Sequence, residues 1–174
     1  MIRRIAITGP ESTGKSWLAE KLAAHYQTEW VPEFARQYLD HLKRPYEQFD
    51  IFEIASGQQA DEAEKERRAR NFLFCDTDPL VTKIWSEVKY GSCDPRILSL
   101  VETHKYHLYL LCDVDLPWQF DPLREHPEMR EQLFDLYLHE LQNRKFPFFV
   151  IRGSGNKRFQ MAVDVIDKFE FVEI

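Results

Sequence analysis

Cysteine is scarce in this chain, and Cys75, Cys93 and Cys112 form no C-x-x-C pair. An odd number of widely spaced cysteines indicates neither a disulfide framework nor a zinc site. Cys75 and Cys112 lie inside apolar runs, so we expect them to be buried thiols. The six histidines show no spacing typical of metal ligands. The residues therefore offer no sign of a His/Cys metal centre.

Long apolar runs and basic stretches are also missing. No segment of 18 apolar residues is present and the N-terminus does not resemble a signal peptide, so we expect a cytoplasmic protein without a membrane partner. The net charge of −6, without a basic stripe, argues against nucleic-acid binding. The length of 174 residues and the 44% of apolar residues predict a single domain over residues 1–174. The oligomeric state is left open.

The densest signal is the stretch Gly9-Pro10-Glu11-Ser12-Thr13-Gly14-Lys15-Ser16. It matches the phosphate-binding loop (P-loop) G-x-x-x-x-G-K-[ST], whose glycines let backbone N–H groups surround a phosphate. A lysine at this position supplies positive charge, and the following hydroxyl is a ligand for Mg²⁺. We therefore predict a nucleotide site formed by Gly9, Glu11, Ser12, Thr13, Gly14, Lys15, Ser16 and Trp17.

Short apolar runs alternate with helical patterns along the whole chain, which is typical of a parallel sheet with crossover helices. The runs predict strands over residues 4–8, 29–31, 72–76, 107–112 and 148–152. Helices are predicted over residues 15–26, 33–42, 49–70, 79–90, 95–103, 128–144 and 157–169. The fold class is therefore α/β: three layers, with a five-stranded parallel sheet between helices.

Ligands of open α/β sheets bind beyond the carboxyl ends of the strands, so the residues after each strand are candidates. Glu33 and Arg36 follow the second strand one helical turn apart, and either line a site together or simply pair with each other. Asp76 ends the third strand as a magnesium-binding carboxylate would. Asp78, which precedes Pro79, is a site residue, an N-cap, or both.

A long irregular segment, at approximately residues 115–130, follows the fourth strand. Its prolines keep it out of regular helix, and its length is typical of an active-site lid. Arg124 and Arg130 would close onto a transferred phosphoryl group. Trp118 either stacks on a ligand ring or packs the lid. After the fifth strand, Asn156-Lys157 resembles the N-K-x-D guanine motif of GTPases, but Phe159 stands in place of its aspartate.

Several of these motifs together resemble the kinase domain of NadR-type nicotinamide riboside kinases. They are the P-loop, Pro-Glu-Phe-Ala-Arg at 32–36, Asp-Thr-Asp-Pro at 76–79, Lys-Tyr-Gly at 89–91, and Pro117-Trp118 with Asp121 and Arg124. The resemblance spans nearly the whole chain. It implies a P-loop kinase fold and transfer of the ATP γ-phosphoryl group to the 5′-hydroxyl of nicotinamide riboside, which gives nicotinamide mononucleotide.

The resemblance also implies roles for single residues. Lys15, Asp78, Glu33 and Arg124 would be catalytic, Ser16 and Asp76 would hold Mg²⁺, and Arg158 would join the P-loop in binding ATP. Glu33, Arg36, Asp76, Asp78 and Trp118 would bind a nucleoside-like small molecule. Either Asp78 or Glu33 would orient the acceptor hydroxyl, or orient and deprotonate it.

Two features depart from the family pattern. Pro32 stands where the family has an aromatic residue, so Trp30 or Trp118 would replace it against the nicotinamide. No counterpart of the adenylyltransferase domain of the fused NadR proteins is present, so we expect the product to need another enzyme. The alternatives are a kinase for another nucleoside or small hydroxyl metabolite, and a nucleotide-binding switch or ATPase module.

Overall fold

The centre of the protein is a sheet of five strands: Arg3–Thr8 (β1), Trp30–Val31 (β2), Phe72–Asp76 (β3), Leu108–Cys112 (β4) and Phe148–Ile151 (β5). The structure is a computed structural model that describes residues 1–172, so the last two positions of the predicted domain lie outside the described residues. The strand order is β2-β3-β1-β4-β5, and neighbouring strands are parallel. The predicted five-stranded parallel sheet is confirmed.

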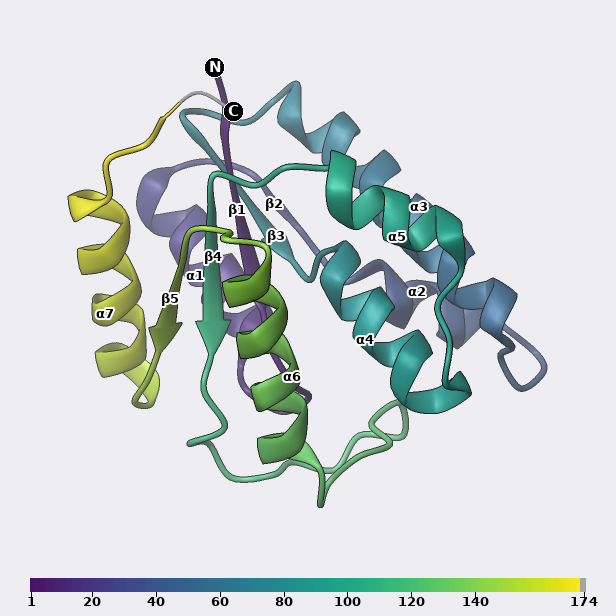
Figure 1. Cartoon of the computed structure of the whole chain (residues 1–174). Coiled ribbons are helices and arrows are strands. Elements are labelled where there is room, and N and C mark those ends of the chain that lie inside the picture. The colour runs from purple at the N-terminus through teal and green to yellow at the C-terminus, as the bar shows by residue number, and fades with distance from the viewer. Residues whose placement is uncertain (173–174) are drawn as a thin grey trace.

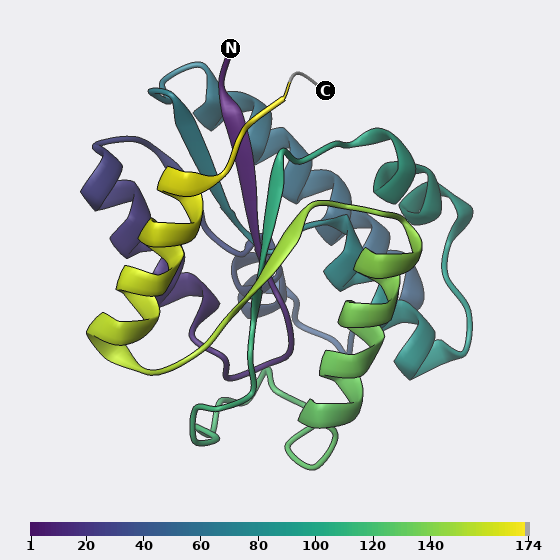
Figure 2. The ribbon, with the colours of Figure 1, turned by 60° about the vertical axis from the view of Figure 1, so that its left-hand side comes forward.

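Helices cover both faces of this sheet (Figures 1 and 2). On one face lie α1 and α7, and on the other lie α4 and α6, with α2, α3 and α5 extending that layer around α4. The predicted three-layer fold is therefore confirmed. The helices of the described residues are Lys15–Tyr26 (α1), Phe34–His41 (α2), Gln48–Glu66 (α3), Pro79–Tyr90 (α4), Pro95–Thr103 (α5), Arg130–Asn143 (α6) and Gly155–Lys168 (α7).

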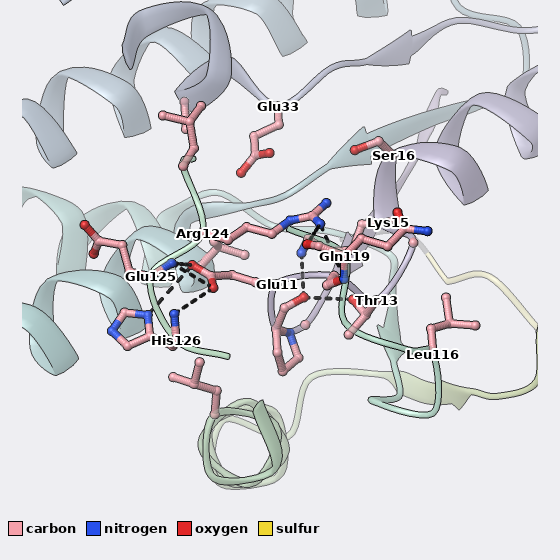
Figure 3. Close-up of a pocket in the computed structure, with 18 of the residues that line it drawn as sticks. Glu11, Thr13, Lys15, Ser16, Glu33, Leu116, Gln119, Arg124, Glu125 and His126 are labelled. Carbon is pink, nitrogen blue, oxygen red and sulfur yellow. Dashed lines mark hydrogen bonds and ion pairs between the residues drawn. The ribbon is translucent and has the colours of Figure 1, made fainter. Parts of the chain in front are cut away.

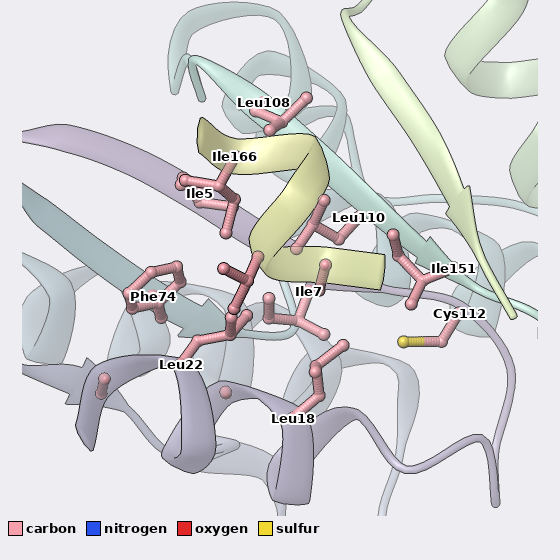
Figure 4. Packing of buried hydrophobic residues seen from close by; sticks show 14 residues of the cluster. Ile5, Ile7, Leu18, Leu22, Phe74, Leu108, Leu110, Cys112, Ile151 and Ile166 are labelled. Carbon is pink, nitrogen blue, oxygen red and sulfur yellow. The ribbon is translucent and has the colours of Figure 1, made fainter. Parts of the chain in front are cut away.

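The alternation of side chains along the strands explains the two cores. Ile5 and Ile7 of β1 point to the same face and pack with Leu18 and Leu22 of α1 (Figure 4). Ala6, between them, faces the other layer of helices. All five side chains are fully buried. β1 is thus buried on both faces, which explains why its sequence is a continuous apolar run.

Most predicted boundaries differ from the structure by a residue or two, with one larger difference. The helix predicted to reach Arg70 ends at Glu66. Asn71 has a φ of +58°, in the left-handed region that asparagine tolerates, and Arg70 forms a bridge with Phe72. This reversal of the chain directs it into β3, so the last turn of the predicted helix does not form.

The strand register brings the segments after three strands to one edge of the sheet. Ile7 of β1 lies beside Asp76 of β3, and Thr8 lies beside Leu111 of β4. The P-loop, the Asp76–Asp78 segment and the lid segment therefore all begin at this carboxyl edge, as predicted. Among residues 1–172, no helix is both long and apolar enough to cross a membrane.

Candidate active site

The P-loop forms a tight turn between β1 and α1, and two of its positions need glycine. Gly9 has a φ of +126°, and a Cβ there would lie 2.9 Å from the backbone oxygen of Cys112. Gly14 has a φ of +78° and is the N-cap of α1, which begins at Lys15. Since the first N–H groups of a helix lack backbone partners, this arrangement suits a bound phosphate.

Side chains of the P-loop hold its shape. The Lys15 ammonium group and the Thr13 hydroxyl each donate a hydrogen bond of 2.8 Å to the Pro10 carbonyl oxygen. Thr13 is fully buried, so its side chain supports the loop from inside. Lys15 lines the adjoining cavity, where phosphate oxygens would compete with Pro10 for its ammonium group.

A cavity of about 530 Å³ adjoins the P-loop (Figure 3). The predicted nucleotide-binding residues from Gly9 to Trp17 line it, together with Arg158 of α7. Its remaining walls come from α2, α4, α6 and the lid segment. Those walls include Glu33, Ala35, Arg36, Leu39, Val81, Ile84, Trp85, Val88, Leu123, Arg124, Glu125, Leu133 and Tyr137. One cavity thus combines an anion-binding loop with an apolar wall that carries a few charged groups, which suits a nucleotide and a second small molecule.

The lid segment is docked onto the P-loop. The Glu11 carboxylate accepts hydrogen bonds of 3.1 Å from the backbone N–H groups of Glu125 and His126 (Figure 3). The Ser12 hydroxyl oxygen accepts one of 2.9 Å from the backbone N–H of Gln119. Glu11 and Ser12, which are predicted to bind the nucleotide, thus hold the lid onto the P-loop.

Two arginines join the lid to its surroundings. Arg36 of α2 forms an ion pair of 2.9 Å with Asp121 of the lid, rather than with Glu33 one turn away. A hydrogen bond from the Leu123 backbone and the pair with Arg36 hold the pKa of Asp121 below its usual value. Arg124 donates to the Ser12 hydroxyl at 3.4 Å, so its guanidinium lies beside the P-loop.

Glu33 and Asp78, the two candidates to act on an acceptor hydroxyl, differ in their surroundings. Glu33 is half-buried, and its carboxylate points into the cavity (Figure 3). Asp78 is buried, and one of its oxygens accepts a hydrogen bond of 2.7 Å from the Leu80 N–H at the start of α4. The cap expected from the Asp-Pro pair is confirmed. Asp78 does not line the main cavity, whereas Glu33 does.

Asp76 ends β3 in an unusual environment. It is 1% exposed, and within residues 1–172 neither of its carboxylate oxygens has a hydrogen-bond partner. Burial and the nearby Glu33 carboxylate raise the pKa of Asp76 to about 6, against the opposing effects of Lys15 and Ser16. The next residue, Thr77, has a φ of +76°, which is rare for a β-branched side chain. Strain and unpaired charge thus coincide beside the P-loop, as they often do at functional sites.

Arg158 was predicted to bind the nucleotide, and the structure shows what occupies its guanidinium. The side chain is fully buried and donates hydrogen bonds to the backbone oxygens of Thr13, Asp113 and Gly153. It also pairs with the Asp115 carboxylate. Its nitrogen atoms thus bind the protein itself, and Arg158 links the P-loop to the ends of β4 and β5. Sequence reasoning missed Asp115, whose only signal was its position after β4.

The aromatic residues at the cavity differ from those expected. Trp30 packs against the core on the α1 and α7 face, so it does not reach the cavity. Trp118 lies in the lid near the guanidinium groups of Arg124 and Arg130, and it is not part of the cavity wall. The aromatic side chains that line the wall across from the P-loop are Trp85 of α4 and Tyr137 of α6. Both helices begin near the carboxyl edge of the sheet. This position in the chain is the signal that could have identified Trp85 and Tyr137 as cavity residues.

The chain matches a known family over most of its length. Residues 4–158 match the model of the AAA domain. The chain belongs to this AAA domain family. It is also 31% identical over 174 aligned residues to the trifunctional NAD biosynthesis/regulator protein NadR of Salmonella typhimurium, and 27% identical to NadR of Escherichia coli K12. Each match covers 95% of this chain, so the predicted resemblance to NadR is confirmed.

Solved structures agree on the fold. A NadR structure in complex with NR superposes with a TM-score of 0.80, at 17% identity, over 99% of this chain and 54% of that one. NadR in complex with NAD and AMP-PNP gives 0.78, at 18% identity, over 99% of this chain and 51% of that one. Deoxyadenosine kinase of M. mycoides gives 0.65, at 14% identity, over 95% and 100% of the two chains. The fold is therefore that of the P-loop kinases.

The family match has a limit in length. This chain spans 42% of the two curated NadR proteins. Their names describe three functions, whereas this chain aligns with less than half of each protein.

Proposed function

We propose that this protein is an ATP-dependent small-molecule kinase that phosphorylates nicotinamide riboside on its 5′-hydroxyl group. The observation that carries the proposal is the continuity of the cavity: Lys15 of the P-loop and the Glu33 carboxylate line the same space beneath the docked lid. A phosphoryl donor on the loop and a hydroxyl near Glu33 would thus share one enclosed site. The relationship to NadR, which has been crystallised with NR and with AMP-PNP, supports this choice of substrates.

The proposed chemistry needs positioning and charge more than a strong base. Lys15 and Arg124 would neutralise negative charge on the transferred phosphoryl group. Glu33 would orient the acceptor hydroxyl and accept its hydrogen bond, since its carboxylate faces the cavity and that of Asp78 caps α4. Arg36, held by Asp121, would line the riboside side. The docked lid would exclude water, which favours transfer to the acceptor over hydrolysis.

Magnesium fits the residues that remain. Asp76 offers two buried oxygens that have no hydrogen-bond partner within residues 1–172, and Ser16 lines the P-loop cavity next to Lys15. The described residues contain no group of three or more His, Cys, Asp or Glu side chains that could hold a metal ion. Asp76 and Ser16 would therefore hold Mg²⁺ together with the nucleotide phosphates, as is usual for this ion. Bound Mg²⁺ would offset phosphate charge.

The proposal is tested by measuring ADP release with Mg²⁺-ATP in the presence and absence of nicotinamide riboside. We expect strong stimulation by the riboside and formation of nicotinamide mononucleotide, detected by mass spectrometry. Stimulation by a different nucleoside, with none by nicotinamide riboside, would show that the proposed substrate is wrong and that the proposed kinase activity is right. ADP release that no small acceptor changes would instead indicate a nucleotide-dependent switch.

A further inference from the structure

Besides its contacts with the P-loop and the Arg36–Asp121 ion pair, the lid is attached through Tyr46, in the loop between α2 and α3. We propose that Tyr46 is a positioning residue that couples closure of the lid to the apolar wall of the cavity. The proposal rests on the kinase reaction proposed above and assigns a role to a residue that does not itself line the cavity.

The hydroxyl of Tyr46 has every hydrogen bond that a phenol can make. It donates a bond of 2.8 Å to the Glu125 carboxylate of the lid. Its oxygen accepts one of 2.9 Å from the indole N–H of Trp85 and another from the Lys89 ammonium group, both on α4. Burial raises the pKa of Tyr46 to about 12, so the phenol keeps the proton that it donates. One hydroxyl thus connects a lid residue with α4.

Two of the residues that Tyr46 joins form part of the cavity. Trp85 and Glu125 line the cavity, one from α4 and one from the lid. The Tyr46 ring lies edge-on to the Trp85 indole, with centroids 5.0 Å apart. A molecule that packs on Trp85 would therefore fix the position of the indole that binds Tyr46. Through Tyr46 it would stabilise the contact with Glu125 of the lid.

The charges around Glu125 strengthen this link. Lys89 forms an ion pair of 2.8 Å with the Glu125 oxygen that Tyr46 does not bind. Burial alone would raise the pKa of Glu125, but hydrogen bonds from Lys89 and Tyr46 outweigh it and hold that pKa below its usual value. Glu125 is therefore charged at neutral pH, and charge-assisted hydrogen bonds of this kind are the stronger ones.

Tyr46 is presented by a braced loop. Arg44 forms two hydrogen bonds, of 2.7 and 2.8 Å, with the fully buried Asp50 carboxylate of α3. The backbone N–H of Glu47 and the Tyr38 hydroxyl donate to the same carboxylate, each at 2.7 Å. The residues on both sides of Tyr46 are thus fixed to α3. A rigid platform transmits a shift of the lid or of α4 that a mobile loop would absorb.

Two of the attachments of the lid thus lie at different parts of the cavity. Glu11 and Ser12 hold it to the P-loop, where the phosphates would bind. Tyr46 holds the lid to α4, whose side chains form the apolar wall on which the acceptor would bind. Both contacts are present in the closed lid, so loss of the Tyr46 contact would loosen the lid on the acceptor side while the contacts with the P-loop remain.

The test compares Tyr46→Phe with wild type by amide hydrogen exchange of the lid, with AMP-PNP alone and with AMP-PNP plus nicotinamide riboside. Tyr46→Phe keeps the ring and removes only the hydroxyl. Tyr26→Phe is the matched control. In the wild type, the Tyr26 hydroxyl donates a hydrogen bond to Asp167 of α7, on the face of the sheet opposite to α4. The KM for the riboside, kcat and ADP release without acceptor are measured on the same three proteins.

We expect Tyr46→Phe to speed lid exchange in the ternary complex about five- to tenfold, and to raise the KM for the riboside by a similar factor. Tyr26→Phe should match wild type. Wild-type lid exchange and KM in Tyr46→Phe would overturn the coupling, even if wild type phosphorylates the riboside. If wild type fails to do so, the proposed substrate is wrong. Faster lid exchange in Tyr46→Phe with AMP-PNP alone would then still support the attachment of the lid through Tyr46.

Discussion

Arg158 of α7 donates a hydrogen bond of 3.1 Å to the backbone carbonyl of Thr13, so the last helix supports the P-loop from behind. The same guanidinium binds the Gly153 carbonyl at 2.7 Å and pairs with Asp115 where the lid begins. Three segments that would surround a nucleotide are thereby tied to one fully buried side chain. Arg158 therefore shapes the nucleotide site through the backbone.

This arrangement predicts that Arg158→Lys weakens ATP binding although it keeps the charge. A lysine ammonium cannot reproduce the fork that serves acceptors on three segments. We expect at least about a tenfold loss of ATP affinity, measured by titration with AMP-PNP, and a lower Tm. Arg152→Lys is the control, because the Arg152 side chain is 61% exposed and pairs with Asp113 at the surface. Equal ATP affinities of Arg158→Lys and wild type would show that the contacts of the Arg158 guanidinium group are not needed for ATP binding.

Lys15 carries the second prediction. Its ammonium group now binds the Pro10 carbonyl, and the proposed reaction requires it to bind the transferred phosphoryl group. Lys15→Ala should therefore reduce kcat by orders of magnitude, as expected for loss of a charge that stabilises the transition state. Steady-state kinetics at saturating ATP measure the effect, and an unchanged Tm confirms an intact fold. Near wild-type turnover in Lys15→Ala would rule out the mechanism.

The choice between Glu33 and Asp78 yields the third prediction. Glu33→Gln should lower kcat about a hundredfold, because it removes the carboxylate that faces the acceptor. Asp78→Asn should change kcat far less, since asparagine can still cap α4 through its side-chain oxygen. Both variants are compared at saturating substrates and with their unfolding midpoints. A larger kcat loss in Asp78→Asn, with a stable fold, would assign the acceptor role to Asp78 instead.

Local patterns in the sequence were enough to predict the sheet, its layers and the position of the P-loop. Gly9 and Gly14 are required by the backbone of one turn, so eight consecutive residues identify that turn. The Asp78 cap likewise depends only on its neighbours Pro79 and Leu80. Such features are encoded over a few residues, and propensity and spacing can therefore reveal them.

The walls of the cavity could not be predicted in the same way. Trp85 and Tyr137 occupy ordinary apolar positions of helices, and only the packing of α4 and α6 over the sheet brings them to one cavity. Trp30 was expected at the cavity but lies away from it, because the side chain of this β2 residue points to the α1 and α7 face. The partner of Arg36 was Asp121, far away in sequence, since the lid folds back over α2. These contacts depend on tertiary structure.

Asp76 carries a cost for stability that gives the last prediction. Burial raises its pKa to about 6, above the value of about 3.9 expected in an unfolded chain. Between these two pH values the folded state keeps a proton that the unfolded state has lost. The contribution of Asp76 to the free energy of unfolding therefore falls as the pH rises from about 4 to about 6.

Asp76→Asn removes this titration, so the variant should gain stability relative to wild type as the pH rises through this range. Denaturant unfolding of the ligand-free proteins in EDTA, from pH 4 to 7.5, measures the difference. Asp164→Asn on the exposed face of α7 is the control and should follow the wild-type profile. Parallel profiles for Asp76→Asn and wild type would mean that the buried carboxylate ionises without cost. A stabilised variant without kinase activity would instead indicate that Asp76 is kept for catalysis at the expense of stability.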